Sequence, residues 1–506
     1  MLNDFYKQFK SGTDIRGVAV DGVAGEPLNL TDETVAKMAA AFLLWLSQRT
    51  GKAVTELKVA VGHDSRISAE RIRKAVVDSM VSRGAQVLNC GLSSTPSMFM
   101  ITLDKECDGS IQLTASHHPY HRNGLKFFTP SGGLDGCDIE AILGFCDADT
   151  LPAACEGGKV ENIDYMKEYA AHLRKIICDG IQAEDYDKPL KGLHIVVDAG
   201  NGAGGFYAYD VLQPLGADIS GSVFLEPDGM FPNHIPNPED KDAMASICGA
   251  VLQSHADLGV IFDTDVDRGG AVDSFGAEIN RNRLVALASV IALEDCPGGT
   301  VVTDSTTSAG LKTFIEGALG GVHYRYRRGY RNVINRAIEL NEQGIDCPLA
   351  IETSGHAALR ENYFLDDGAY LCTKIIIKMA QLRAEGKTLA ELTAALEEPR
   401  EESELRFKIK AEDFREYGEN VLADLQTYAE AQEDWLIADD NREGLRVSFD
   451  REQGWFLLRL SVHDPIMPLN LESMKEGGCR EIAVRLYGFL KGCDQLDLTA
   501  MERYIG

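Results

Sequence analysis

Short apolar runs alternate with longer segments of helical periodicity along most of the chain. Apolar runs of strand length occupy residues 57–62, 86–91, 109–113, 193–198, 258–262 and 300–304. Residues 32–48 carry apolar side chains at helical spacing, which predicts an amphipathic helix. Alternating strands and helices are typical of α/β domains with a parallel sheet. Ligands of such sheets bind at the carboxyl ends of strands, so the loops after these runs are the first candidates for a site.

The pattern changes near residue 401. Residues 445–450 and 455–459 are strand-like and flank a turn at 451–454, which predicts a β-hairpin. A helix is expected from about residue 480 to 490, where the chain closes. The last segment therefore differs from the α/β rhythm before it.

Length and charge limit the possible functions. A chain of 506 residues is too long for one core, so several domains are expected. The net charge of -28, from 78 acidic and 50 basic residues, argues against nucleic acid or an anionic membrane as the main partner. An anionic substrate would need a local cluster of basic residues.

Targeting and redox signals are weak. The N-terminus lacks the apolar run of a signal peptide, and no stretch approaches 18 consecutive apolar residues. Twelve cysteines are scattered without a C-x-x-C motif, which favours reduced thiols in the cytoplasm over a disulfide framework or a zinc site.

A serine lies in a loop that follows one of the predicted strands. Residues 114–119 include Ser116, His117 and His118, and Lys126 follows after a glycine-containing turn. A serine hydroxyl is a weak nucleophile unless neighbouring groups activate it, and imidazole and ammonium groups can do so. The same residue types also gather in ordinary turns. The loop alone leaves both interpretations open.

Three carboxylates follow the predicted strand at 258–262. Asp263, Asp265 and Asp267 stand at alternate positions, with Arg268 after them. Side chains at this spacing can converge on one point, where a hard divalent cation such as Mg²⁺ would relieve their repulsion. Arg268 stands where a calcium loop of the EF-hand type requires glycine, which argues against that module. A solvated acidic turn is the alternative.

A glycine-rich turn follows the strand at 193–198. Residues 200–205 read G-x-G-x-x-G, and Glu226 comes about twenty residues later. This is the outline of a dinucleotide-binding fingerprint, so a Rossmann-type dehydrogenase is a rival hypothesis. A plain strand-to-helix turn is the simpler interpretation.

The cluster of basic residues lies at residues 324–331. Arg325, Arg327, Arg328 and Arg331 alternate with tyrosines and a glycine. Interleaved aromatic and basic residues can bind nucleic acid, but the acidic total argues against that partner and leaves an anionic substrate as the better candidate.

Several motifs occur together in one order. The Ser116 loop, Asp-Gly-x-Phe-Pro at 228–232 and Asp-x-Asp-x-Asp-Arg at 263–268 resemble the α-D-phosphohexomutase family, which includes phosphomannomutase/phosphoglucomutase enzymes. Further blocks that look like this family are 12–17, 62–66 and 94–96, so the resemblance extends over nearly the whole chain.

The resemblance implies an α/β protein of four domains around a central cleft. Three would be similar mixed α/β sheet domains, and the fourth a smaller α+β domain. The implied boundaries are 1–155 for the phosphoserine loop, 156–298 for the metal, 299–400 for the sugar and 401–506 for the phosphate.

The resemblance also implies residue roles. Phosphorylated Ser116 would exchange its phosphoryl group with a hexose phosphate through a 1,6-bisphosphate, and Ser116 would bind Mg²⁺ together with Asp263, Asp265 and Asp267. The residues expected around this group are Arg16, His117, Lys126, Arg268 and His356, of which Lys126 and His356 are the candidates for proton transfer. The substrate contacts implied are Arg327, Glu352, Ser354, Arg459 and Ser461. His463 and Asp464 replace a threonine and a glutamate of the family's phosphate clamp, which leaves the substrate range open.

The expected protein is thus an isomerase, a cytoplasmic monomer or homodimer that acts on mannose or glucose phosphates. It would use Mg²⁺ and a hexose 1,6-bisphosphate activator, without nucleic-acid or membrane partners. A phosphoglucosamine mutase and a non-catalytic sugar-phosphate-binding relative remain alternatives, beside the dehydrogenase from another class.

Overall fold

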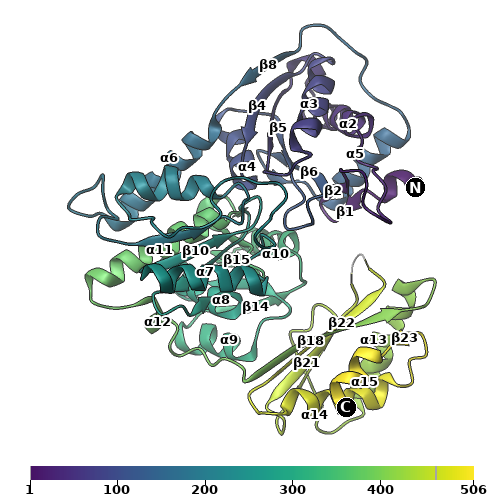
Figure 1. Cartoon of the computed structure of the whole chain (residues 1–506). Helices are drawn as coiled ribbons and strands as arrows, with labels where there is room; N and C mark the ends of the chain where they lie inside the picture. Colours follow the sequence, from purple (N-terminus) through teal and green to yellow (C-terminus); the bar gives the residue numbers. More distant parts are fainter. Residues whose placement is uncertain (1, 462–463) are drawn as a thin grey trace. The chain divides into compact units, whose positions relative to one another are not determined.

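The structure is a computed structural model that describes residues 2–461 and 464–506. Contacts divide the chain into two compact units. Unit 1 comprises Met1–Ile291 and Ser354–Leu392, and unit 2 comprises Ala292–Thr353 and Thr393–Gly506. Figure 1 labels the helices and strands within each unit.

The first sheet of unit 1 has eight strands in the order β1-β2-β6-β5-β3-β4-β8, with β7 paired to β6. Strands β5, β3, β4 and β8 run parallel, whereas β2 and β6 are antiparallel to their neighbours, so the sheet is mixed. The strands are β1 (Lys10–Ser11), β2 (Asp14–Val18), β3 (Lys58–His63), β4 (Gln86–Leu92), β5 (Gly109–Leu113), β6 (Arg122–Thr129), β7 (Gly132–Gly133) and β8 (Lys159–Asn162).

Helix α2 (Asp32–Thr50) illustrates how the sequence pattern becomes packing. Thr31 caps its first turn through a bond from the Thr34 N–H, and Gly51 ends it in the left-handed conformation. Phe42 belongs to its buried stripe, and its ring lies 4.7 Å from that of Phe127 on β6. The other helices of this part are α1 (Asp4–Lys7), α3 (Ala69–Val81), α4 (Thr95–Asp104) and α5 (Gly136–Asp147).

Ser68 directly precedes α3. Its side chain makes no capping bond. Instead, its hydroxyl accepts a hydrogen bond from Asn123 Nδ2 at 3.0 Å, so a tertiary contact takes the place of the local one.

The second sheet of unit 1 has the order β12-β11-β10-β9, with β9 and β10 parallel and the rest antiparallel. Strands β16 and β17 pair antiparallel. The elements are α6 (Tyr165–Ile181), β9 (Ile195–Asp198), a π-helix (Tyr207–Leu212), α7 (Lys241–Ser254), β10 (Leu258–Phe262), β11 (Gly269–Asp273), β12 (Glu278–Ile279), α8 (Arg281–Glu294), β16 (Ala357–Leu359), β17 (Leu365–Asp366), α11 (Gly368–Ala384) and α12 (Leu389–Leu392).

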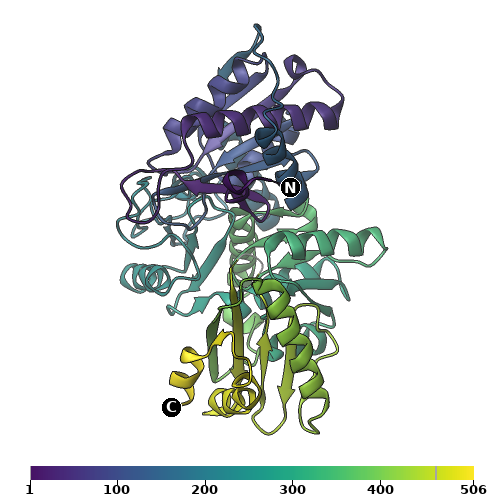
Figure 2. The same ribbon diagram turned by 90° about the vertical axis from the view of Figure 1, so that its right-hand side faces the viewer.

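Unit 2 contains the parallel strands β14, β13 and β15, and a six-stranded sheet of order β19-β20-β21-β22-β18-β23. Helices α13, α14 and α15 pack on the six-stranded sheet, as Figures 1 and 2 show. The elements are β13 (Thr300–Asp304), α9 (Ala309–Thr313), β14 (Val322–Tyr326), α10 (Tyr330–Glu342), β15 (Leu349–Ile351), β18 (Glu401–Ile409), α13 (Phe414–Glu430), β19 (Leu436–Ile437), β20 (Leu445–Phe449), β21 (Gly454–Leu458), β22 (Ile466–Ser473), α14 (Gly478–Leu490), β23 (Leu496–Asp497) and α15 (Thr499–Ile505).

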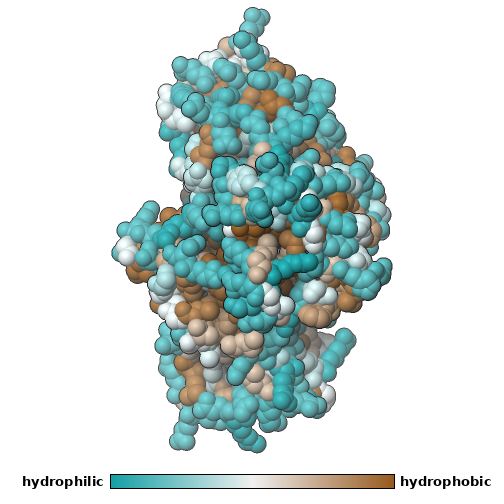
Figure 3. All heavy atoms as spheres, turned by 90° about the vertical axis from the view of Figure 1, so that its left-hand side faces the viewer, coloured by the Kyte–Doolittle hydropathy of each residue, from teal (hydrophilic) through white to brown (hydrophobic). Residues whose placement is uncertain are grey.

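The predicted α/β class is confirmed, and so is the hairpin, which β20 and β21 form. The predicted closing helix corresponds to α14, but α15 follows it at the C-terminus. Hydrophilic side chains cover most of the face drawn in Figure 3, with hydrophobic residues in small separate groups. No helix of the described residues is both long and apolar enough to cross a bilayer.

Candidate active site

Two loops of unit 1 bring Ser116 and the carboxylate run together. The Ser116 loop leaves the end of β5, and residues 263–268 leave the end of β10. Ser116 Oγ donates a hydrogen bond to Asp263 Oδ2 at 3.0 Å and accepts one from Arg268 Nη2 at 2.9 Å. The serine oxygen therefore lies between a carboxylate and a guanidinium group.

Both loops have strained backbone. Ser116 has φ 50° and Val266 has φ 68°. Residues other than glycine rarely adopt this left-handed backbone conformation, and β-branched residues such as valine avoid it. Thr114 Oγ1 accepts the Ser116 N–H at 2.9 Å, and the Gly368 N–H bonds to the Val266 carbonyl at 3.1 Å. Strain of this kind persists only where the surroundings hold it, and it is concentrated at functional sites.

Arg66 is the main support of the Ser116 loop. Its guanidinium group is buried and donates to the carbonyl oxygens of Pro119 at 2.8 Å, His118 at 2.7 Å and Arg122 at 2.9 Å. It also bonds to the Ser116 carbonyl and pairs with Asp64, which follows β3. One side chain thus fixes the path of the whole loop.

The three aspartates converge as the sequence predicts. Asp263, Asp265 and Asp267 are fully buried, and one oxygen of each lies within 4.8 Å of the others. Oδ1 of Asp265 and Oδ1 of Asp267 accept no hydrogen bond within the described part of the chain. Burial, and then the charges of Asp267 and Asp265, raise the pKa of Asp263 well above its usual value. Buried oxygen donors with open lone pairs and mutual repulsion fit a small hard cation such as Mg²⁺.

Lys126 belongs to the same cluster. It lies on β6 and donates a hydrogen bond to Asp267, and its Nζ is 3.6 Å from Asp265 Oδ2. Thr95, at the start of α4, bonds to Asp265 both through its hydroxyl and through its N–H, the latter to the carbonyl at 2.8 Å. The carboxylate loop is therefore held by elements of the first sheet domain.

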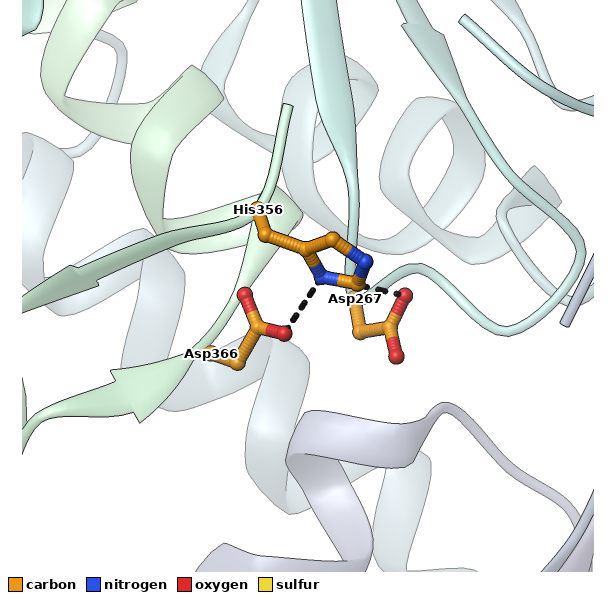
Figure 4. A group of neighbouring side chains, drawn as sticks. All are labelled: Asp267, His356 and Asp366. Atoms are coloured by element: carbon orange, nitrogen blue, oxygen red, sulfur yellow. Dashed lines mark hydrogen bonds and ion pairs between the residues drawn. The ribbon is translucent and has the colours of Figure 1, made fainter. Parts of the chain in front are cut away.

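His356 lies between Asp267 and Asp366, as Figure 4 shows. Its Nδ1 is 2.5 Å from Asp366 Oδ2 and 3.9 Å from Asp267 Oδ1. Asp366 is the last residue of β17, and His356 directly precedes β16. The antiparallel β16–β17 pair therefore brings the imidazole and the Asp366 carboxylate together beside Asp267. The sequence did not single out Asp366 as a site residue.

His117 is uncharged at neutral pH. Burial, and then the nearby charge of Arg268, lower its pKa to about 2. Its Nδ1 lies 3.3 Å from Ser116 Oγ and accepts a hydrogen bond from Arg268. His117 can therefore orient Arg268 and the serine oxygen, but it brings no positive charge. Arg16, on β2, pairs with Asp14 at 2.9 Å, and its charge also lowers the pKa of His117.

Ser354, the remaining candidate in unit 1, is buried just before His356. The other predicted substrate residues lie in unit 2. Glu352 accepts the Gly329 N–H at 2.6 Å, and Arg327 is exposed, with its Nε bonded to the Arg442 carbonyl at 3.2 Å.

The predicted phosphate clamp also lies in unit 2. Arg459 is half-buried, and Ser461 Oγ accepts the Asp464 N–H at 3.2 Å. His463, which departs from the family pattern, lies outside the described residues.

The glycine-rich turn at 200–205 packs against the protein itself. A Cβ on Gly202 would lie 2.6 Å from the Thr264 carbonyl oxygen, and one on Gly205 would lie 2.2 Å from that of Leu225. The missing side chains therefore let neighbouring backbone segments, including the carboxylate loop, pack directly against this turn. A packing role accounts for the G-x-G-x-x-G pattern, as the simpler interpretation predicted.

Two site residues that the sequence did not single out lie in segments that resemble the family. Arg66 and Thr95 lie in the blocks at 62–66 and 94–96, each of which follows a predicted strand. No local signal marks the partnership of Asp366 with His356.

Fold and site together define a multidomain α/β protein in which a serine loop faces a carboxylate-arginine loop. The chain matches phosphoglucomutase/phosphomannomutase alpha/beta/alpha domain I over residues 8–144, domain II over 167–276 and domain III over 280–399. It therefore belongs to the α-D-phosphohexomutase superfamily, as its motifs predicted.

Individual relatives span nearly the whole chain. The chain is 28% identical to a phosphomannomutase/phosphoglucomutase of Pseudomonas aeruginosa, over 95% of both proteins. It is 29% identical to a phosphoglucomutase/phosphomannomutase of Thermococcus kodakarensis, over 91% of this chain and 95% of the relative. A solved structure of a phosphoglucomutase/phosphomannomutase family protein from Burkholderia thailandensis shares the fold, with a TM-score of 0.78, 24% identity and 98% coverage of both chains.

Proposed function

We propose that this chain is a phosphohexose mutase, an isomerase that interconverts the 1- and 6-phosphates of mannose or glucose. The observation that carries the proposal is the position of Ser116 Oγ, 3.0 Å from Asp263 Oδ2 and 2.9 Å from Arg268 Nη2. The names of relatives that match over 95% of both chains support the reaction class.

The carboxylates of Asp263, Asp265 and Asp267 would hold Mg²⁺ together with an oxygen of phosphorylated Ser116. When bound, the cation offsets the negative charge of the transferring phosphoryl group. Arg268 contributes a second positive group at the serine oxygen, where charge develops as the phosphorus–oxygen bond breaks.

The proposed reaction has two balanced halves. The free hydroxyl of the sugar phosphate forms a bond to phosphorus while the bond from phosphorus to Ser116 Oγ breaks, and the hydroxyl proton passes to Lys126 or His356. The product of this half is a hexose 1,6-bisphosphate. In the second half, Ser116 Oγ forms a bond to the phosphorus of the other phosphoryl group while the bond from that phosphorus to the sugar oxygen breaks. The sugar oxygen takes back the proton from Lys126 or His356, so the phosphoserine is restored and the isomer is released.

We assign the grip on the sugar hydroxyls to Glu352 and Ser354. A carboxylate and a hydroxyl that bond to sugar hydroxyls discriminate strongly, because an unpaired polar group in a closed site is costly. Arg327, Arg459 and Ser461 would bind the phosphate that is not transferred, since arginine matches the geometry of phosphate oxygens.

A hexose 1,6-bisphosphate is the proposed activator, because it can phosphorylate an unmodified Ser116. We place the enzyme in the cytoplasm, as a monomer or homodimer, where twelve free thiols would stay reduced.

The test combines mass spectrometry with a mutase assay. The purified protein should carry one phosphoryl group on Ser116 and should convert glucose 1-phosphate or mannose 1-phosphate when Mg²⁺ and a bisphosphate are supplied. Glucosamine 1-phosphate, assayed in parallel, tests the alternative substrate. Full activity in Ser116→Ala would exclude the serine as the carrier, and inactivity of the phosphorylated protein on every hexose phosphate would exclude the mutase.

A further inference from the structure

One loop of unit 2, residues 440–443 between β19 and β20, contacts the arginine run at three points. Asp440 Oδ2 accepts a hydrogen bond from Arg325 Nη1 at 2.7 Å, and the Arg442 carbonyl accepts one from Arg327 Nε at 3.2 Å. Glu443 Oε2 accepts the backbone N–H of Arg328 at 3.0 Å. Two carboxylates and one backbone carbonyl of this loop therefore bond to the strongest cationic segment of the chain.

Glu443 also lies beside the predicted phosphate clamp. Its carboxylate accepts a hydrogen bond from Ser305 Oγ. The next residue, Gly444, packs on Arg459 so closely that an added Cβ would lie 2.8 Å from both Cα and Cβ of that arginine. Glu443 is thus the direct chain neighbour of the residue that packs on Arg459.

Arg459 is a cation with spare bonding capacity. Its Nε is buried and donates no hydrogen bond within the described residues. Burial lowers the pKa of Arg459, and the negative charge of Glu443 is the largest influence that raises it. The charges of Glu404 and Asp304 also raise this pKa, whereas the positive charge of Arg328 lowers it. Among these groups, Glu443 is the carboxylate that bonds to the backbone of the arginine run, at the Arg328 N–H.

We propose that Glu443 is an affinity-setting residue, an internal anion beside Arg459 that opposes the binding of the substrate's non-transferred phosphate. The inference rests on the proposed function for the identity of the phosphate, but the anion site itself rests on the contacts in unit 2. A phosphate dianion that binds Arg459 meets the Glu443 carboxylate as a like charge. Like charges repel more strongly in a partly buried site than in water, so we expect Glu443 to weaken phosphate binding by about tenfold.

The decisive variant is Glu443→Gln. The amide oxygen can still accept the bonds from Ser305 Oγ and the Arg328 N–H, so the loop keeps its contacts while the charge is removed. Titration calorimetry of the full chain with inorganic phosphate and with glucose 6-phosphate should show binding about tenfold tighter than in the wild type. The KM for the hexose 1-phosphate should fall by a similar factor.

Glu433→Gln is the matched control, because it removes an exposed carboxylate of the same unit and changes the net charge equally. Phosphate affinity should stay at the wild-type value in this variant. Unchanged or weaker phosphate binding in Glu443→Gln, or an equal gain in Glu433→Gln, would overturn the inference, because Glu443 would then only hold the loop or add to the overall charge.

The two proposals can fail separately. A wild type that is inactive on all hexose phosphates, with inorganic phosphate still bound more tightly by Glu443→Gln, would reject the mutase and support the opposing anion. An active wild type whose phosphate affinity does not respond to Glu443→Gln would support the mutase and reject the opposing anion.

Discussion

Nδ1 of His356 lies 2.5 Å from Oδ2 of Asp366, and 3.9 Å from the buried carboxylate of Asp267. A carboxylate on one ring nitrogen fixes the tautomer and the orientation of an imidazole and leaves the other nitrogen to face a substrate. Asp366 is therefore a positioning residue that acts through His356.

Asp366→Asn should lower kcat by about tenfold to a hundredfold and leave KM nearly unchanged, because the amide no longer fixes the His356 tautomer. Steady-state kinetics with a hexose 1-phosphate separate the two parameters. In a His356→Gln background the same substitution should have little further effect, since both changes act on one group. Additive losses in the double variant would show that Asp366 does not act through His356.

Arg66→Met should destabilise the protein by about 3–5 kcal/mol, because it leaves the buried Asp64 charge unpaired and frees the carbonyls of the Ser116 loop. Urea unfolding measures the loss, and hydrogen exchange should quicken at residues 116–122. Adding Asp64→Asn to Arg66→Met should recover part of the free energy of unfolding, because no buried charge is then unpaired. It should not restore the protection of residues 116–122 against hydrogen exchange. A loop that stays protected in Arg66→Met would contradict the role assigned to this arginine.

The sequence predicts strands well where the hydrophobic pattern decides them. The apolar run at 258–262 coincides with β10, and a buried strand of this kind has few alternatives. The three aspartates after it converge because a short loop from a strand end leaves them little choice of direction.

Partnerships between distant segments could not be predicted in this way. Arg66 supports carbonyls about fifty residues further along the chain, and Asp366 meets a histidine that lies just before the neighbouring strand. Such contacts depend on how the sheets pack, not on local periodicity. The hydroxyl of Ser68 illustrates the same limit, because Asn123 takes the place of the helix N–H groups.

The pair formed by His234 and Asp198 should make stability depend on pH. Both side chains are buried, and His234 Nε2 lies 3.1 Å from each Asp198 carboxylate oxygen. Burial lowers the pKa of His234, but the bond to Asp198 and its charge outweigh burial and raise it. The protonated histidine therefore stabilises the fold at pH values below its unfolded pKa, and this contribution is lost as the pH rises through the folded pKa.

Urea unfolding of the wild type and His234→Gln between pH 5.5 and 8.5 tests this sign. The difference in the free energy of unfolding between the wild type and His234→Gln should be largest at pH 5.5 and should shrink as the pH rises. A difference that grows with pH would mean that His234 is neutral in the folded protein.

Gly202→Ala should impair the carboxylate loop, because the added methyl group would lie 2.6 Å from the Thr264 carbonyl oxygen. Overpacking of this kind costs about 1–3 kcal/mol, and the backbone shift should raise the Mg²⁺ concentration needed for half-maximal activity. Gly144→Ala is the control, since its Cβ meets nothing within 4 Å inside α5, and alanine there should stabilise by about 0.5–1 kcal/mol. Unfolding and Mg²⁺ titration measure both variants. An unchanged Mg²⁺ requirement in Gly202→Ala would show that the turn does not support the loop.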